Sequence, residues 1–267
     1  MSGSASLVEA AVSGLARQKV VLVTGAAGGI GRAAALQFAA QGAAHVVVAD
    51  IDGDGAATTA DEINSAVSGP RASAVEVDVT DEAAVSALLD GIVSQHGRLD
   101  SAFNNAGISD QMADFHDLDR ARWDRMIAVN LTSVFLCMKH ELRHMAAAGG
   151  GTIVNTSSGA GVVAAPGQPH YTAAKHGVVG LTKAAAQEYA RRGVRVNAVL
   201  PGSTDTPMIR RFIGDNPEIA KLIASTNIGG RMLTADEVAE VAVWLASDAA
   251  SMVNGQSVIV DGGGLVR

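Results

Sequence analysis

The sequence predicts an α/β protein in which about seven parallel strands form one doubly wound sheet with helices on both faces. Short β-branched runs alternate along the chain with longer, Ala-rich segments of helical spacing. The runs VVLV and VVVA are apolar without alternation, which is typical of strands buried on both faces of a parallel sheet. Together these two observations indicate a chain of repeated strand and helix units.

The expected strands and helices follow one another in order. The strands are KVVLVTG from Lys19, HVVVAD from His45, AVEVDV from Ala74, LDSAFNN from Leu99, GTIVNTS from Gly151, VRVNAVL from Val194 and SVIVDGG from Ser257. The helices are expected over about 30–41, 55–67, 81–96, 119–147, 171–192 and 235–247. The chain has no low-complexity tract or charge block that would mark a linker. We therefore expect a single domain over residues 18–267.

Two segments lie outside this alternation. Residues 203–233 contain Pro207 and Pro217 and an irregular pattern after the sixth strand. Ligands of α/β sheets bind beyond the carboxyl ends of the strands, so a long connection there is a candidate substrate loop or lid. The alternative is a surface excursion with its own small apolar cluster. Residues 1–17 lack a basic n-region and a long apolar run, so we expect a flexible or lightly docked leader.

Composition excludes several classes of function. Hydrophobic residues make up 48% and charged residues 18% of the 267 residues, which favours a compact core over disorder. The net charge of -7 gives no basic field for nucleic acid or for an anionic membrane surface. Cys137 is the only cysteine, so no internal disulfide can form, and we expect a soluble, cytoplasmic protein.

A glycine-rich turn follows the first strand. Gly25, Gly29 and Gly31 in TGAAGGIG allow a tight turn and a close approach of backbone N–H groups to a pyrophosphate at the start of a helix. Asp50 ends the second strand 19 residues after Gly31 (50 − 31 = 19), which is the place of an acidic ribose ligand. Its charge would repel a 2′-phosphate, so the pattern favours a Rossmann-type domain that binds NAD rather than NADP. The alternative for Asp50 is a solvated residue at a strand end.

Several further motifs follow one another along the chain. These motifs are Asp78-Val79, Asn104-Asn105-Ala106-Gly107, Asn130, Ser158, Tyr171 with Lys175, Pro201-Gly202 and Asp261-Gly262-Gly263. Together with TGAAGGIG they make residues 18–264 resemble the classical short-chain dehydrogenase/reductase family, which implies a Rossmann-type fold. The resemblance implies cofactor contacts at Gly25, Gly29, Ile30, Gly31, Asp50, Ile51, Asp78, Val79, Asn105, Ala106, Gly107, Tyr171, Lys175, Pro201, Gly202, Thr204 and Thr206.

Tyr171 and Lys175 form the expected chemical centre. They are four residues apart, so on a helix they share a face. Lowering the pKa of a tyrosine by roughly 3 units needs about 4 kcal/mol, which a unit charge at ~4 Å supplies at an effective dielectric constant near 20. The resemblance implies that Tyr171 exchanges a proton with the substrate while hydride passes to or from the nicotinamide. It also implies that Lys175 holds the nicotinamide ribose.

The resemblance assigns two more catalytic roles. Ser158 would orient the reacting oxygen, and it is preferred to Ser157 because the family's usual 13-residue gap to the tyrosine gives 171 − 13 = 158. Asn130 would fix a water that relays protons to Lys175; an asparagine that satisfies a neighbouring strand is an alternative compatible with the relay. We expect Ser157 to bond to the backbone and Cys137 to pack as a small hydrophobe. The histidines beside Tyr171, at positions 170 and 176, are expected at the pocket edge or in packing.

These expectations converge on an NAD-dependent oxidoreductase that interconverts a secondary alcohol and a ketone. Two alternatives stay open: a 3-oxoacyl-carrier-protein-type reductase using NADPH, and a nucleotide-binding scaffold without turnover. Apolar residues such as Val162, Val163, Met208 and Phe212 hint at an apolar or cyclic substrate. No His, Cys or Asp cluster has metal spacing, so no metal is expected. The resemblance also implies a homo-oligomer, with a tetramer favoured.

Overall fold

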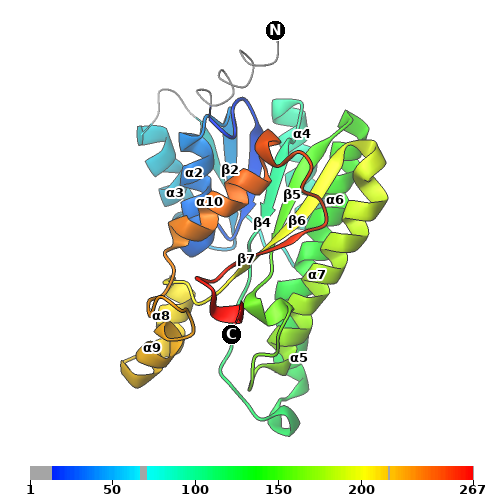
Figure 1. Ribbon diagram of the computed structural model, residues 1–267. Helices are drawn as coiled ribbons and strands as arrows, with labels where there is room; N and C mark the ends of the chain where they lie inside the picture. The colour runs from blue at the N-terminus through cyan, green and yellow to red at the C-terminus, as the bar shows by residue number, and fades with distance from the viewer. Residues whose placement is uncertain (1–13, 67–70, 216, 267) are drawn as a thin grey trace.

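The computed structural model describes residues 14–66, 71–215 and 217–266. Seven strands form one sheet in the order β3-β2-β1-β4-β5-β6-β7, and every neighbouring pair is parallel (Figure 1). The predicted fold class is therefore confirmed. The strand order reverses direction between β1 and β4, which is where open α/β sheets bind ligands. The strands are β1 Val20–Thr24, β2 His45–Asp50, β3 Ala72–Glu76, β4 Ser101–Asn104, β5 Gly151–Thr156, β6 Val194–Pro201 and β7 Ser257–Val260.

Helices cover both faces of the sheet. One face packs against α2, α3 and α10, and the other against α4, α6 and α7 (Figure 1). The helices are α2 Gly29–Ala40, α3 Gly53–Ala66, α4 Glu82–His96, α5 Arg120–Ile127, α6 Ser133–Ala148, α7 Pro169–Tyr189, α8 Pro207–Ile213, α9 Pro217–Ala224 and α10 Ala235–Leu245. Among the described helices, none is long and apolar enough to cross a membrane.

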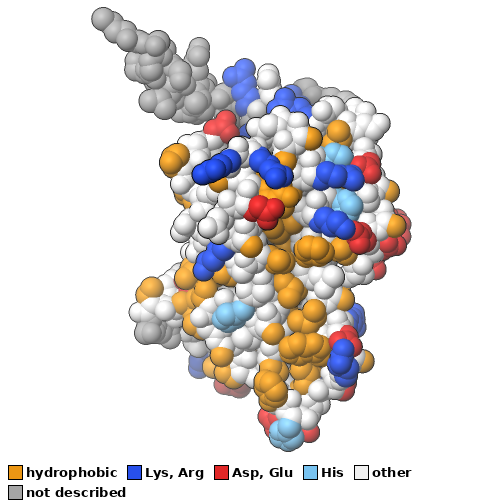
Figure 2. Space-filling view, turned by 90° about the vertical axis from the view of Figure 1, so that its right-hand side faces the viewer, with side chains coloured by type: hydrophobic (Ala, Val, Ile, Leu, Met, Phe, Trp, Pro, Cys, Tyr) orange, Lys and Arg blue, Asp and Glu red, His pale blue; other side chains and the backbone are white. Residues whose placement is uncertain are grey.

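On the outer face formed by α6 and α7, the hydrophobic and the basic side chains lie in different regions. Figure 2 shows hydrophobic side chains gathered along the middle and lower part of this face, while most Lys and Arg side chains lie higher up. Phe135 of α6 is one large hydrophobic side chain that stays exposed. A broad exposed apolar surface of this kind is typical of an interaction site.

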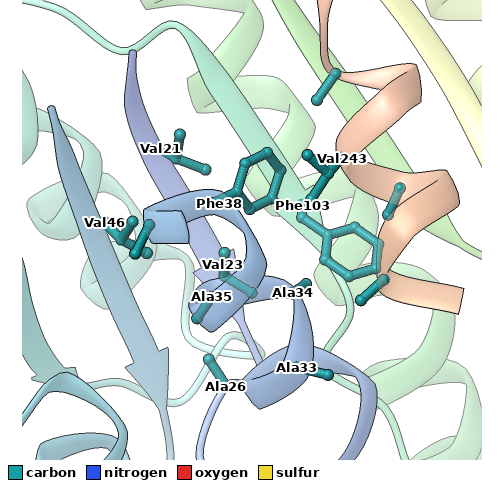
Figure 3. Close-up of a cluster of buried hydrophobic side chains, with 14 of the residues drawn as sticks. Val21, Val23, Ala26, Ala33, Ala34, Ala35, Phe38, Val46, Phe103 and Val243 are labelled. Carbon is teal, nitrogen blue, oxygen red and sulfur yellow. The ribbon is translucent and has the colours of Figure 1, made fainter. Parts of the chain in front are cut away.

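The core on the α2 side explains why the first strand can end in a tight turn. Alanines dominate the inner face of α2, so the helix lies close to the sheet, and Phe38 fills the remaining space beside Phe103 of β4 and Val243 of α10 (Figure 3). All three side chains are buried. Close packing of this kind holds the start of α2 in a fixed place at the end of β1.

The helix expected over 119–147 is present without a break from Arg120 to Ala148, but its winding changes within it. It comprises α5, a π-helical turn over Ala128–Thr132 and α6. A π-turn inserts one residue into the helical ladder, and such turns are frequent at functional sites. Sequence periodicity did not predict it, because one extra residue hardly disturbs an apolar pattern.

Other element boundaries also differ from expectation. α7 begins at Pro169, two residues before the expected start, because a proline is well suited to the first turn of a helix. The segment 203–233 carries two short helices, α8 and α9, where an irregular loop was expected. Of the expected leader, residues 1–13 lie outside the described residues. Ala16 is buried, and its N–H group donates to the carbonyl of Gln41 at 3.0 Å.

Candidate active site

The glycine-rich turn joins β1 to α2 at the carboxyl edge of the sheet. Gly25 and Gly29 have φ angles of +65° and +55°, which glycine adopts without strain. A Cβ atom at Gly31 would collide with the carbonyl oxygen of Gly25, and one at Gly25 would lie 2.7 Å from Ala106 Cα. The N-cap residue of α2, Gly28, makes no side-chain capping bond. The first turn of α2 therefore offers N–H groups to an anion, and the residues fit a pyrophosphate.

Asp50 lies beside this turn with a fixed carboxylate. One oxygen accepts from Ala27 N at 2.9 Å and the other from Asp52 N at 3.0 Å. Each carboxylate oxygen retains a lone pair that can accept from a ribose hydroxyl. Next to it, Ile51 is 67% exposed, so an apolar side chain stands open at the end of β2.

The residues expected to contact the cofactor after β3 and β4 differ in their surroundings. Asp78 is exposed and accepts from the N–H and hydroxyl groups of Thr80, whereas Val79 is buried. Asn105 connects the strand ends: its N–H donates to Thr24 Oγ1 at 3.0 Å, and its side-chain amide donates to the carbonyls of Thr24 and Gly25 at 3.2 Å. Asn105 thus holds the glycine-rich turn against β4.

Tyr171, Lys175 and Ser158 come together at the ends of β5 and α7. Lys175 is 3% exposed, its Nζ donates to the carbonyl of Thr156 at 2.9 Å, and burial lowers its pKa to about 8. The ammonium lies 5.6 Å from the centre of the Tyr171 ring. Ser158 hydrogen-bonds the phenol of Tyr171 and accepts from Ala160 N at 3.1 Å. The predicted pair therefore shares one face of the helix, with the serine at the phenol.

The pKa of Tyr171 differs from the sequence-based expectation. Burial of the phenol raises its pKa, and the hydrogen bond with Ser158 lowers it by less. The expectation that Lys175 lowers this pKa is therefore wrong for the protein groups by themselves. The physical reason is that the ammonium points to the carbonyl of Thr156, while desolvation penalises the phenolate.

Asn130 lies in the π-turn and is buried. Its amide pairs with both peptide groups of Ile108: Oδ1 accepts from Ile108 N at 3.2 Å, and Nδ2 donates to Ile108 O at 3.1 Å. A Cβ atom at Gly107 would lie 2.7 Å from Asn130 Oδ1, so the glycine permits this approach. Asn130 therefore satisfies a neighbouring backbone, although the neighbour is the loop after β4 and not a strand.

The residues after β6 lie over the glycine-rich turn. Thr204 is buried, and its hydroxyl donates to Gly202 O at 3.0 Å. Thr206 caps α8 by accepting from Ile209 N, and its Cγ2 lies 3.3 Å from where a Cβ of Gly29 would stand. Pro201, the last residue of β6, is buried. The segment 203–233 thus begins beside the start of α2.

The neighbouring side chains follow expectation. The hydroxyl of Ser157 donates to Lys175 O at 2.8 Å, as expected for a residue bonded to the backbone. Cys137 is buried, and desolvation raises the pKa of its thiol, which makes it a packing residue. His176 is exposed. His170, by contrast, lies in the interior against Asp110, a partner that its sequence neighbours do not indicate.

One cluster with ligand-type side chains was not expected. The ligand atoms of Asp114, His116 and Asp117 lie within 4.8 Å of one another, a grouping that the spacing along the sequence did not indicate. The expectation that the protein binds no metal stays a prediction. All three residues are exposed, and His116 Nε2 lies 3.7 Å from Asp117 Oδ1. Exposed acidic clusters are common without an ion, and this one lies on the loop before α5.

The glycine-rich turn and the group of Ser158, Tyr171 and Lys175 lie together at the carboxyl edge of the parallel sheet, and this combination defines the class of protein. The chain belongs to the classical short-chain dehydrogenase/reductase family, whose members are NAD(P)-dependent oxidoreductases. Residues 25–264 match the family model described as enoyl-(acyl carrier protein) reductase.

Two curated relatives cover nearly the whole chain. Cis-4-hydroxycyclohexanecarboxylate dehydrogenase of Sinomonas cyclohexanicum is 47% identical over 248 residues, which are 92% of this chain and 96% of that protein. Cyclohexanol dehydrogenase of Acinetobacter sp. (strain SE19) is 43% identical over 255 residues, which are 96% and 98% of the two chains.

Solved structures agree with this membership. Levodione reductase superposes with a TM-score of 0.89 at 37% identity and covers 92% of this chain and 97% of its own. Carveol dehydrogenase from Mycobacterium avium, in complex with NAD, gives a TM-score of 0.88 at 34% identity, with coverages of 95% and 100%.

Proposed function

We propose that this protein is an NAD-dependent dehydrogenase that interconverts a cyclic secondary alcohol and its ketone. The observation that carries the proposal is the grouping of Tyr171, Ser158 and Lys175 at the strand ends that adjoin the glycine-rich turn. A substrate oxygen that is hydrogen-bonded to Ser158 would lie beside the phenol of Tyr171, which can exchange a proton, and near the buried ammonium of Lys175. The names of the relatives support a ring substrate, because they act on cyclohexanol, a hydroxycyclohexanecarboxylate and levodione.

The chain's residues divide the chemistry among them. Bound nicotinamide supplies the acceptor or donor of the hydride. Ser158 donates a hydrogen bond to the reacting oxygen and orients it. Tyr171 accepts the alcohol proton at its phenolic oxygen during oxidation and returns a proton to the carbonyl oxygen during reduction. Lys175, which is mostly protonated at pH 7 with a pKa of about 8, would hold the hydroxyls of the nicotinamide ribose.

The preference for NAD rests on the charges near the ribose site. Asp50 is held by two backbone N–H groups, so it would stay close to any 2′-phosphate and repel it. Arg32, which follows the last glycine of the turn, is ion-paired with Glu62 of α3. A cation committed to a carboxylate is less available to a phosphate. Both observations favour an unphosphorylated ribose.

Two further features belong to this proposal. Residues 18–267 act as one catalytic domain in which the segment 203–233 covers the substrate, and Val162 and Val163 offer exposed apolar side chains just beyond Ser158. The enzyme works in the cytoplasm as a homotetramer. Support for the assembly is the apolar surface on the face of α6 and α7 (Figure 2). Light scattering with size-exclusion chromatography tests it: Phe135→Glu should reduce the mass, and a wild-type monomer would contradict it.

The experiment for the activity compares cyclohexanol with a linear secondary alcohol, each with NAD⁺ and NADP⁺. Tyr171→Phe should lower kcat by at least ~100-fold. Tyr189→Phe is the matched control, because it changes the only other tyrosine, and it should keep wild-type kinetics. Asp50→Asn should reduce the preference for NAD⁺ by roughly 10-fold or more, since hydrogen bonds to a charged group are lost. Activity that survives Tyr171→Phe would refute the mechanism.

The same assay separates the alternatives. Reduction of a 3-oxoacyl substrate with NADPH tests the carrier-protein reductase. Turnover of that substrate with a strong NADPH preference would replace the proposal. Tight NAD binding without turnover of any alcohol or ketone would favour a scaffold.

A further inference from the structure

The segment after β7, residues 261–266, folds back on itself around one carboxylate. Asp261 is 7% exposed; its Oδ1 accepts from Gly263 N and its Oδ2 from Leu265 N, both at 2.8 Å. Gly262 and Gly263 have φ angles of +60° and +83°, which the turn requires. Both oxygens of Asp261 are thus used to hold the backbone of this segment in one conformation.

The folded segment touches the substrate loop on one side. A Cβ atom at Gly264 would lie 2.6 Å from Thr226 O, and one at Gly263 would lie 2.9 Å from Ile228 Cδ1. The contact with the backbone of Thr226 requires glycine at position 264, whereas Ile228 Cδ1 is the end of a flexible side chain. Ile228 itself is 58% exposed, so an apolar side chain of the substrate loop stands open beside the segment.

On its other side the segment reaches the catalytic serine. Leu265 Cδ1 lies 3.4 Å from the position of a Cβ on Gly159, and Gly159 directly follows Ser158. The end of β6 supports the contact, because a Cβ on Gly202 would lie 2.7 Å from Asp261 Cβ. Leu265 therefore packs beside Gly159, the residue next to Ser158, whose hydroxyl is expected to orient the reacting oxygen.

We propose that Leu265 forms the apolar wall that selects substrates by the bulk on the ring, and that Asp261 is the positioning residue that holds Leu265 there. The inference rests on the proposed function, because the ring is located by the oxygen at Ser158. The substrate class is then a cyclic secondary alcohol whose ring carbons lie against Leu265. Groups with a charge on that side of the ring are disfavoured, since they would lose water against an apolar wall.

The test compares cyclohexanol with 4-tert-butylcyclohexanol on wild type, Leu265→Ala and Leu265→Phe. Leu265→Ala should raise the ratio of kcat/KM for the bulky over the plain alcohol by about 10-fold, and Leu265→Phe should lower it by a similar factor, as methylene-sized pocket changes do. The change should appear in KM, because Tyr171 and Lys175 are untouched. Val266→Ala is the matched control, since Val266 is 81% exposed, and it should leave the ratio within twofold.

Asp261→Asn tests the positioning role. An amide cannot accept from both N–H groups, so the selectivity should move as in Leu265→Ala. If Asp261 acts through Leu265, the double variant should show the ratio of Leu265→Ala with no further change. NAD binding measured by fluorescence should match wild type in every variant and confirms the fold.

The outcomes separate the two levels of the proposal. An active wild type whose ratio is unmoved in both Leu265 variants would overturn the wall and leave the proposed function intact. A wild type that oxidises neither alcohol would overturn the proposed function and this inference with it. Opposite shifts in Leu265→Ala and Leu265→Phe would establish the wall.

Discussion

His170 Nε2 lies 3.2 Å from Asp110 Oδ2, although the two residues are 60 positions apart in the chain. Asp110 also accepts from Arg122 Nε at 2.7 Å, and Gln168 Nε2 donates to its carbonyl at 3.0 Å. The loop after β4 is thereby fastened to α5 and to the first turn of α7. Since Tyr171 follows His170, the same contacts fix the backbone that carries the phenol.

The first prediction concerns this contact. His170→Phe keeps a ring of similar size but removes the hydrogen bond to Asp110, so the free energy of unfolding should fall by about 1–3 kcal/mol. Displacement of Tyr171 should also lower kcat. His176→Phe is the control, because His176 is exposed on the same helix. Urea denaturation and steady-state kinetics measure both effects, and equal changes in the two variants would contradict the role of the contact.

The second prediction follows from the burial of Lys175, which lowers its pKa from 10.5 to about 8. Between these values the unfolded chain binds the proton and the folded chain does not, so this group makes stability rise as pH increases from 8 to 10.5. The difference in free energy of unfolding between wild type and Lys175→Met should therefore change by about 3 kcal/mol between pH 7 and pH 10.5.

Denaturant unfolding of both proteins at the two pH values checks this second prediction. The activity of Lys175→Met should fall by at least ~100-fold at every pH. A difference in unfolding free energy that does not depend on pH would mean that the lysine is not desolvated in the folded state.

The third prediction concerns Glu141, which is fully buried in α6. Burial raises its pKa from 4.5 to about 8, and Asn104 Nδ2 donates to its Oε2 at 2.9 Å. Among the described residues, Glu141 Oε1 is buried without a hydrogen-bond partner, so burial penalises the charged carboxylate. Glu141 is therefore mostly neutral in the folded protein at pH 7.

The sign of the pH effect is opposite to that of Lys175. The unfolded chain loses this proton above pH 4.5 while the folded chain keeps it, so stability from this group falls between pH 4.5 and pH 8 and is constant above. Glu141→Gln keeps a donor and an acceptor, so it should match wild type near pH 4.5 and exceed it by up to about 4 kcal/mol at pH 8. Thermal unfolding across this range should show no such divergence for the exposed control Glu240→Gln.

The fourth prediction uses two glycines in helices. Gly31→Ala places a methyl group against the carbonyl of Gly25, so it should abolish detectable NAD binding in calorimetry and lower stability by about 1–3 kcal/mol. Gly91→Ala in α4 meets no atom within 4 Å, and it should raise stability by about 0.5–1 kcal/mol without changing NAD affinity. Loss of binding in both variants would show that the turn is not the cause.

The sheet and the chemical pair were predictable because local patterns encode them. VVLV and VVVA can be buried on both faces only in a covered parallel sheet, and the four-residue spacing of Tyr171 and Lys175 defines one helical face. Gly25 and Gly31 of the nucleotide turn were predictable because a Cβ at either position collides with the backbone. These constraints act within a few residues of the chain.

The missed features arise from contacts between distant segments. The partner of the Lys175 ammonium is the carbonyl of Thr156, a group that every residue carries and no side chain announces. Asp110 is one of many acidic residues, and only the fold brings it to His170. The raised pKa of Tyr171 depends on burial, which the spacing of two residues cannot report.

The π-turn at Ala128–Thr132 makes the number of residues between α5 and α6 important for the structure. A π-turn accommodates one extra residue by widening a single turn, so deleting one residue here would restore regular winding without rotating α5 relative to α6. Arg122 would stay near Asp110, while the widened turn that brings Asn130 to Ile108 would be lost. A single-codon deletion in this turn should thus separate Asn130 from the loop after β4 and leave the two helices aligned.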